Sequence, residues 1–277
     1  MYYINGIEEV TRSIQKVLGL SGITGDLSDK KLQECYYRFL KKESIFSNFH
    51  FSDDIQLTDF HGLKKIAPEF CVEKEKHFSS NSFLLQKRTL NGFFKNAFSN
   101  LEAKNPVIFG LARFLIKLIL VNQLTSYTNG TTNDTIGFSS MDFKDHFNEQ
   151  DFIELVIHQM THMVLFMDDR CYEHMRKDNK EAMIETGLKY VLGGTKFPAY
   201  LAFHSYIVGV EVLCFRWQST GLNYQGIYHG DTSRIINVCE AFKKSLLDHV
   251  ELFFPRGQSI LNDSIPLLNK VIAEYSN

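Results

Sequence analysis

Several features that would point to well-known classes of protein are missing from this sequence of 277 residues. Thirty lysines and arginines stand against 32 aspartates and glutamates, and the net charge of −2 leaves no basic excess for a nucleic-acid backbone. The five cysteines are scattered, odd in number and without a Cys-x-x-Cys pair, which argues against a disulfide framework or a zinc ribbon. We therefore expect a protein of a reducing compartment that does not bind nucleic acid.

Targeting segments are also missing. The first residues lack the basic start, apolar core and small-residue cleavage site of a secretory signal. The most apolar run, residues 106–121, contains Arg113 and Lys117 and is shorter than the ~20 residues that a membrane-spanning helix needs. The sequence therefore predicts a cytoplasmic protein that does not associate with a membrane.

What the sequence does contain is an apolar helix with two histidines, His158 and His162, between Leu155 and Asp169. Histidines four residues apart lie on one face of a helix and can bind one metal ion together. Ten histidines in 277 residues would give about 0.3 such pairs by chance, so the spacing alone is weak evidence. Burial of two imidazoles requires hydrogen-bond partners or a metal, and we favour a metal over a pair of hydrogen-bonded core histidines.

A catalytic metal site needs a third ligand from elsewhere in the chain. His204, near the start of a second apolar helix over residues 203–218, is the preferred candidate, and Glu211, two turns later on the same helix, is its rival. His174 stands in a polar segment and is expected to be solvated. Asp168 and Asp169 either end the histidine helix or support a metal ligand by hydrogen bonding.

Gln159 occupies the position after the first histidine, where zinc peptidases of the His-Glu-x-x-His type carry a catalytic glutamate. A carboxamide cannot take a proton from metal-bound water. Ordinary zinc-peptidase hydrolysis is therefore disfavoured, unless the chain is a Glu-to-Gln inactive form of such an enzyme. A non-haem iron oxygenase needs no base at this position, and Gln159 is compatible with that chemistry.

The periodicity of apolar residues predicts a mainly helical α+β protein in which the metal-binding helices lie beside a small β-sheet. We expect a single compact catalytic domain over residues 1–277, with a helical N-terminal portion (1–105) and a metal-site portion (106–277). The predicted elements are listed in chain order: helices over 7–18 and from 28 to 40, a helix from 109 passing into a strand over 118–127, a strand over 135–140, and helices from 148 or 151 to about 166, over 203–218, over 231–254 and over 259–275.

Two details of this prediction concern chain direction and caps. Turn signals at Asn129-Gly130 and Asn133-Asp134 predict that the two strands form a hairpin-like pair, whose edge beside the histidine helix would suit an extended peptide. The segment from Asp263 to Pro266 has the composition of a helix cap and is placed near the start of the last helix.

The histidine helix, residues 157–169, together with residues 203–213, resembles a His-Glu-x-x-His family associated with ribosomally made, modified peptides. The resemblance covers about the second half of the chain, with Gln159 as the departure. It implies an Fe(II)- and 2-oxoglutarate-dependent enzyme that hydroxylates the β-carbon of a residue in a precursor peptide. His158 and His162 match the helix histidines of the family, and His204 matches the histidine that completes the iron site.

Under this reading, a 2-oxo acid needs a cation for its distal carboxylate, and arginine suits that role by its two-pronged geometry. Arg216, which follows the second motif, is the predicted cofactor-binding residue. The alternatives are a helix-end arginine in water or in an internal salt bridge. For the whole chain, the alternatives are a zinc metallopeptidase and a peptide-binding relative without catalytic activity.

Overall fold

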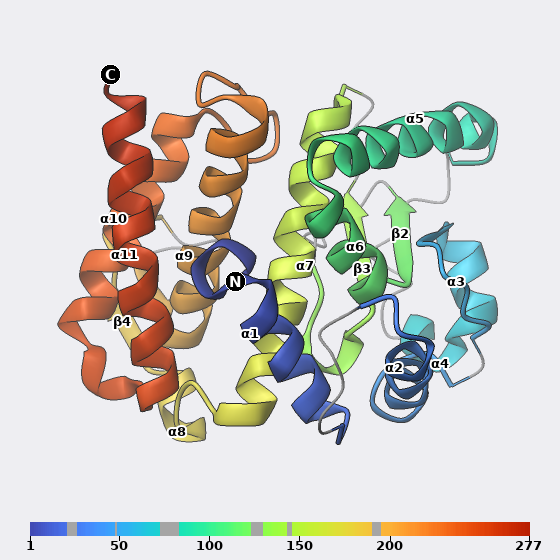
Figure 1. Ribbon diagram of the computed structural model, residues 1–277, viewed down its shortest axis with the longest axis horizontal. Coiled ribbons are helices and arrows are strands. Elements are labelled where there is room, and N and C mark those ends of the chain that lie inside the picture. Colours follow the sequence, from blue (N-terminus) through green and yellow to red (C-terminus); the bar gives the residue numbers. More distant parts are fainter. Residues whose placement is uncertain (21–26, 48, 73–82, 123–129, 143–145, 190–194) are drawn as a thin grey trace. The chain divides into compact units, whose positions relative to one another are not determined.

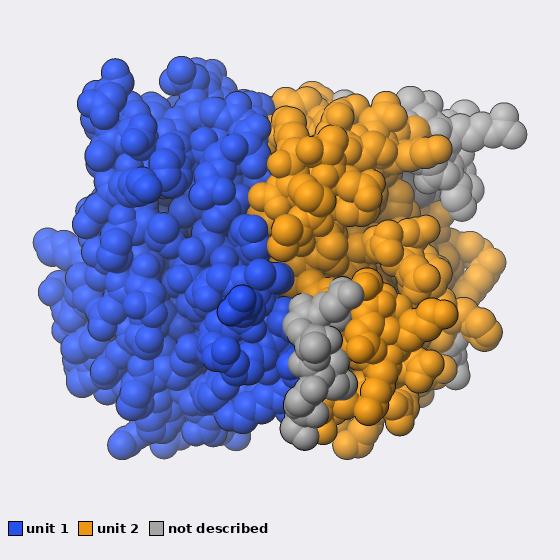
Figure 2. Space-filling view, in the orientation of Figure 1, with its two compact units in different colours: residues 1–17, 167–277 blue, residues 18–166 orange. Residues whose placement is uncertain are grey.

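The computed structural model describes residues 1–20, 27–47, 49–72, 83–122, 130–142, 146–189 and 195–277, with the side chains of residues 83–91 excepted (Figure 1). The chain divides into two compact units, which Figure 2 colours separately. Unit 1 consists of residues 1–17 and 167–277, and unit 2 of residues 18–166. The single catalytic domain expected from the sequence stays a prediction.

Unit 2 contains a small sheet with helices around it (Figure 1). Its helices before the histidine helix are α2 (Lys30–Glu43), α3 (Phe60–Ile66), α4 (Pro68–Val72), α5 (Phe83–Lys104) and α6 (Pro106–Leu115). The strands β1 (Gln56–Thr58), β2 (Leu118–Asn122) and β3 (Phe138–Asp142) form the sheet in the order β1-β2-β3. Strand β2 is central and almost completely buried, as its continuous apolar sequence requires.

The pairing of β2 with β3 corrects the predicted hairpin. The two strands run parallel, with Leu118 opposite Phe138, and β1 also runs parallel to β2. Parallel neighbours need a crossover connection, so the turn signals around residues 129–134 do not join two antiparallel strands. Gly130 instead pairs with Ser140 as an isolated bridge on the outer edge of β3, and residues 123–129 lie outside the described part.

Helix α7 (Glu149–Tyr172) carries His158 and His162. Its start is closed by a reciprocal pair of hydrogen bonds: Asp151 N donates to Asn148 Oδ1 at 3.0 Å and Asn148 N donates to Asp151 Oδ2 at 3.1 Å. This capping arrangement satisfies N–H groups that the first helical turn leaves open, and it confirms the predicted start. The helix continues past Phe166, where the sequence predicted its end, so Asp168 and Asp169 lie in its last turns.

Unit 1 is built mainly from four helices: α1 (Tyr2–Val17), α9 (Ala199–Phe215), α10 (Thr232–Asp248) and α11 (Pro255–Tyr275). Shorter elements complete it: α8 (Lys177–Lys180), η3 (Arg216–Thr220), η4 (Val250–Leu252) and the antiparallel strands β4 (Met183–Glu185) and β5 (Lys196–Pro198). Helix α9 is buried over most of its length and packs against α10 and α11. An all-round apolar helix such as α9 is expected to be a core element.

The predicted cap before the last helix is wrong. Helix α11 already begins at Pro255, and Asp263 to Pro266 lie inside it. Ser264, which resembles a cap residue in sequence, is buried and donates to Leu261 O at 2.6 Å, with Tyr206 Oη 2.9 Å away. The hydroxyl is thus satisfied within the helix, and it acts as a core contact to α9.

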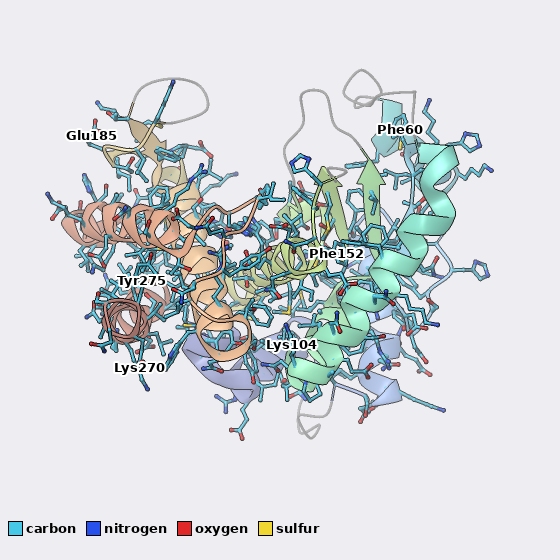
Figure 3. All side chains as sticks on the ribbon, turned by 90° about the horizontal axis from the view of Figure 1, so that it is seen from above. Phe60, Lys104, Phe152, Glu185, Lys270 and Tyr275 are labelled. Carbon is cyan, nitrogen blue, oxygen red and sulfur yellow. The ribbon has the colours of Figure 1, made fainter. Side chains whose placement is uncertain are left out.

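The observed architecture confirms a mainly helical α+β fold with a small sheet. Figure 3 shows Phe152 of α7 between the strands and α5, where its ring packs at 4.6 Å from that of Phe94 and 5.4 Å from that of Phe98. This aromatic cluster holds the first half of α7 within unit 2. None of the described helices combines the length and apolar character needed to cross a bilayer.

Candidate metal site

His158 and His162 point toward each other from successive turns of α7. Their Nε2 atoms lie 3.1 Å apart and their ring centroids 4.8 Å apart. Both side chains are half-buried, and desolvation lowers the pKa of His162 to about 4. The neutral imidazole is the form that binds a metal, so His162 is in the ligand form throughout the neutral range. The Phe166 ring, stacked at 6.2 Å and 19°, fixes the far side of His162.

The distance between the two Nε2 atoms can be compared with that of two ligands on one ion. With metal–nitrogen bonds of about 2.1 Å, neighbouring ligands of an octahedral ion are separated by about 3.0 Å and those of a tetrahedral ion by about 3.4 Å. The 3.1 Å separation of His158 and His162 is closer to the octahedral value. A direct hydrogen bond between a protonated and an unprotonated nitrogen has the same length, and it is the competing explanation.

His204, the predicted third ligand, lies on α9 in unit 1 and is 3% exposed. Its ring packs against that of Tyr200, with 4.2 Å between centroids. Within the part of the chain that the structure describes, no three or more His, Cys, Asp or Glu side chains form a group that could hold a metal ion. His158 and His162 are therefore the two ligands that the described geometry supports, and His204 stays a predicted ligand.

Glu211, the rival ligand, is occupied by the start of α1. Its carboxylate accepts hydrogen bonds from Tyr3 N and Ile4 N, both at 3.1 Å, and it forms an ion pair with the Met1 amino group. A carboxylate is favourable at this position because the first N–H groups of a helix have no intrahelical acceptor. Glu211 thus serves as a buried cap for α1, which accounts for an acidic residue in the apolar helix α9.

Gln159 is fully buried between the two histidine positions, and neither its amide nitrogen nor its amide oxygen has a hydrogen-bond partner among the described residues. A buried polar group without a partner costs about 1–3 kcal/mol. A carboxamide in this state neither holds a proton nor accepts one from water. The residues of α7 therefore fit a site that binds through its histidines, and they lack the base that hydrolysis needs.

Arg216, the predicted cofactor-binding residue, is fully buried at the end of α9. Its guanidinium donates to Gly230 O at 2.9 Å, and to Tyr224 O and Thr232 Oγ1 at 3.3 Å. The Tyr224 ring also lies beneath it, 5.1 Å from the guanidinium carbon. These contacts fix the loop between α9 and α10, and they support the interior structural alternative. Binding of a 2-oxo acid by Arg216 stays a prediction.

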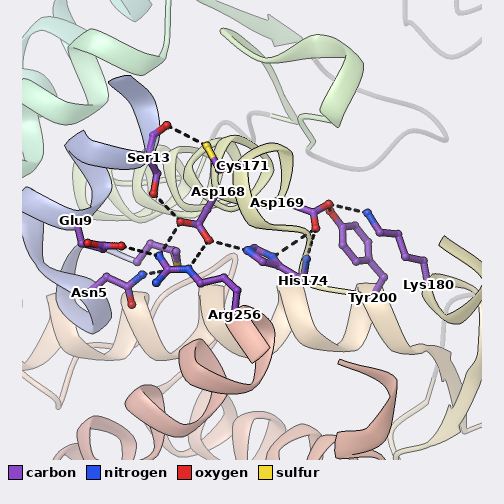
Figure 4. A network of polar contacts seen from close by, with 11 residues as sticks. Asn5, Glu9, Ser13, Asp168, Asp169, Cys171, His174, Lys180, Tyr200 and Arg256 are labelled. Carbon is purple, nitrogen blue, oxygen red and sulfur yellow. Dashed lines mark hydrogen bonds and ion pairs between the residues drawn. The ribbon is translucent and has the colours of Figure 1, made fainter. Parts of the chain in front are cut away.

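A buried polar network within unit 1 is centred on Asp168 (Figure 4). Its carboxylate accepts from Ser13 Oγ at 2.7 Å, from His174 Nε2 at 2.8 Å and from Arg256 through Nε at 2.8 Å and Nη2 at 2.7 Å. Four donors use the acceptor capacity of one carboxylate, so Asp168 is fully satisfied. Burial alone would raise the pKa of Asp168, but the hydrogen bonds from Arg256, His174 and Ser13 outweigh it and hold the pKa well below the usual range.

The position of His174 corrects the expectation that it is solvated, because its side chain is completely buried in this network. Its backbone N–H donates to Asp169 Oδ1 at 2.7 Å, which holds the turn after α7 against the helix end. Asp169 also accepts from Lys180 Nζ at 2.6 Å and from Tyr200 Oη at 3.1 Å. Burial raises the pKa of Asp169, but the charge of His174 and the Lys180 hydrogen bond outweigh this and lower it overall.

Sequence reasoning missed Arg256 and Ser13, which meet Asp168 from α11 and α1. The spacing of 88 and 155 residues from Asp168 gives no local periodic signal. The available signal was the pair of adjacent aspartates at the end of an apolar helix, since buried carboxylates require cationic or hydrogen-bonding partners. No protein-family model matches the chain, and no curated protein matches it.

Proposed function

We propose that the chain is a metal-dependent, peptide-modifying enzyme of the Fe(II)/2-oxoglutarate type, which hydroxylates the β-carbon of a residue in a ribosomally made precursor peptide in the cytoplasm. His158 and His162 would bind the metal, with His204 as the third ligand. The observation that carries the proposal is the 3.1 Å separation of the two facing Nε2 atoms, which suits neighbouring positions on an octahedral ion. Bound iron would supply the activation of dioxygen with 2-oxoglutarate as co-substrate.

The chain's own residues support this chemistry in three ways. Desolvation keeps His162 neutral and ready to bind, because the pKa is lowered to about 4. The stacked Phe166 ring restricts the rotation of His162, and the Thr161 hydroxyl, which donates to Ile157 O at 2.8 Å, satisfies itself within the helix. Gln159 contributes no base, which favours oxidative chemistry over hydrolysis.

Metal binding is the first test. Protein purified without oxygen is titrated with Fe(II), and we expect one tightly bound iron per chain, lost in His158→Ala and His162→Ala and retained in His50→Ala, which alters an exposed histidine. The His204→Ala variant tests the third ligand separately. Unchanged iron binding in both α7 variants would overturn the metal site, and unchanged binding in His204→Ala would remove His204 alone.

Turnover is the second test. Iron-loaded protein is incubated in air with 2-oxoglutarate, with and without a candidate precursor peptide, and succinate and peptide mass are measured. Succinate together with a peptide heavier by one oxygen atom supports the proposal. Peptide cleavage by a zinc-loaded Gln159→Glu variant would instead support the zinc metallopeptidase. Tight peptide binding without turnover under either metal would support a non-catalytic peptide-binding relative.

A further inference from the structure

A pocket of about 280 Å³ opens in unit 2 between the segment leading into β1 and the helices α5 and α6. Pockets for drug-sized ligands measure roughly 300–1,000 Å³, so this volume suits a smaller molecule. It lies away from His158 and His162, neither of which lines it. Its residues are described in full, and they come from the segment 54–57, from one face of α5 and from α6.

The inner wall of the pocket is aromatic. Phe94 and Phe98 lie one turn apart on α5, and Phe109 reaches the pocket from α6, with 6.3 Å between the ring centroids of Phe98 and Phe109. Ile55 and Leu57 add aliphatic surface from the β1 side. Phe94 is 1% exposed, so the inner wall is anchored in the core and is not a loose surface patch. Such a wall takes a flat or branched apolar side chain.

The rim carries two charges of each sign, listed as Asp54, Glu102, Lys95 and Arg113. Arg113 Nη1 lies 3.9 Å from Asp54 Oδ1, and the side chains are 42% and 86% exposed. A solvent-exposed pair at this distance is weak, so a ligand can displace the contact at little cost. The pocket thus presents a guanidinium and a carboxylate close together beside an apolar wall, with no net charge on the rim.

We propose that this pocket binds a free α-amino acid with an apolar, preferably aromatic, side chain. In such a ligand the ammonium and carboxylate groups share one carbon, next to the side chain. Arg113 matches the carboxylate through its two-pronged donors, and Asp54 accepts from the ammonium group. The phenylalanine side chains of α5 and α6 receive the apolar group. The site is separate from the proposed metal ligands and takes a different class of ligand.

The test is calorimetric titration of the full chain with L-phenylalanine. We expect saturable binding, at least tenfold weaker for glycine, which lacks the side chain, and for N-acetyl-L-phenylalanine amide, which lacks both charges. Arg113→Gln and Asp54→Asn should each weaken binding by about tenfold. Lys104→Gln, an exposed change at the end of α5 outside the pocket, is the matched control and should bind as the parent chain does (Figure 3).

A blocking variant keeps the test independent of the charged rim. Ser99 is an exposed lining residue, so Ser99→Trp fills the pocket without removing a core side chain. Loss of L-phenylalanine binding in Ser99→Trp, with an unchanged melting temperature, supports the proposal. Absence of saturable binding to the parent chain, or binding that Ser99→Trp leaves intact, would overturn it. Equal binding of the blocked amide would also overturn it, and would indicate a pocket for a side chain of a peptide.

Discussion

Arg256 forms a two-pronged contact with Asp168, from Nε to Oδ2 at 2.8 Å and from Nη2 to Oδ1 at 2.7 Å, across 88 residues of sequence. The aspartate is 1% exposed, so this contact joins α11 to the end of α7 through a desolvated carboxylate. Loss of one partner from a buried pair leaves the other charge without compensation. The pair is therefore a main determinant of how unit 1 holds together.

We expect Arg256→Met to lower the free energy of unfolding by about 3 kcal/mol, because Asp168 stays buried without its cation. Urea unfolding followed by circular dichroism measures the change. The matched control is Lys243→Met, which removes the ion pair with the more exposed Glu240 and should cost less than about 0.5 kcal/mol. Equal effects of the two substitutions would show that the Asp168 contact is not energetically special.

Acid should weaken unit 1 through the same carboxylate. The pKa of Asp168 is lower in the folded chain than in the unfolded chain, so its contribution to stability is complete above the unfolded value of about 3.9 and is lost as the pH falls toward the folded value. We expect the urea midpoint of the parent chain to fall between about pH 5 and pH 2. The midpoint of Asp168→Asn, measured in the same buffers, should depend less steeply on pH. An identical pH dependence in both would contradict the assignment.

Replacement of Gln159 should not destabilise the protein, although the residue is completely buried. Its amide atoms have no partner among the described residues, so Gln159→Met is expected to leave the free energy of unfolding unchanged or to raise it by up to about 2 kcal/mol. The neighbouring Thr161→Val is the control, because it removes a hydroxyl that is bonded to Ile157 O and should cost about 1 kcal/mol. A clear loss of stability in Gln159→Met would mean that the amide does have a partner.

Close contact between α9 and α10 depends on Gly209. A Cβ atom at this position would lie 2.5 Å from Cys239 Sγ, so Gly209→Ala should destabilise the protein by about 1–3 kcal/mol through overpacking. Gly110→Ala, in helix α6 with open space around the added atom, should instead stabilise by about 0.5–1 kcal/mol. Thermal melting of the single variants and of Gly209→Ala/Cys239→Ala tests the cause. The double variant should recover much of the loss, and no recovery would locate the strain elsewhere.

Local signals predicted much of the secondary structure. Asn148 and Asp151 close the start of α7, and Asp231 caps α10 by accepting from Arg234 N at 2.7 Å, as their side chains and positions suggest. The apolar run before Leu118 passes from helix into strand as expected. The cap-like segment at Asp263 misled because a Ser hydroxyl can also be satisfied inside a helix, by a carbonyl of its own preceding turn.

The sequence by itself determined the mainly helical α+β class, the apolar helices α7 and α9 and the pairing of His158 with His162, because helical periodicity and caps act over a few residues. Only the tertiary structure decided that β2 and β3 run parallel, that His174 is buried on Asp168, and that Glu211 caps α1. Strand direction depends on crossover connections, and a buried charge takes whichever partner the packed helices bring to it. Neither effect leaves a periodic trace in the sequence.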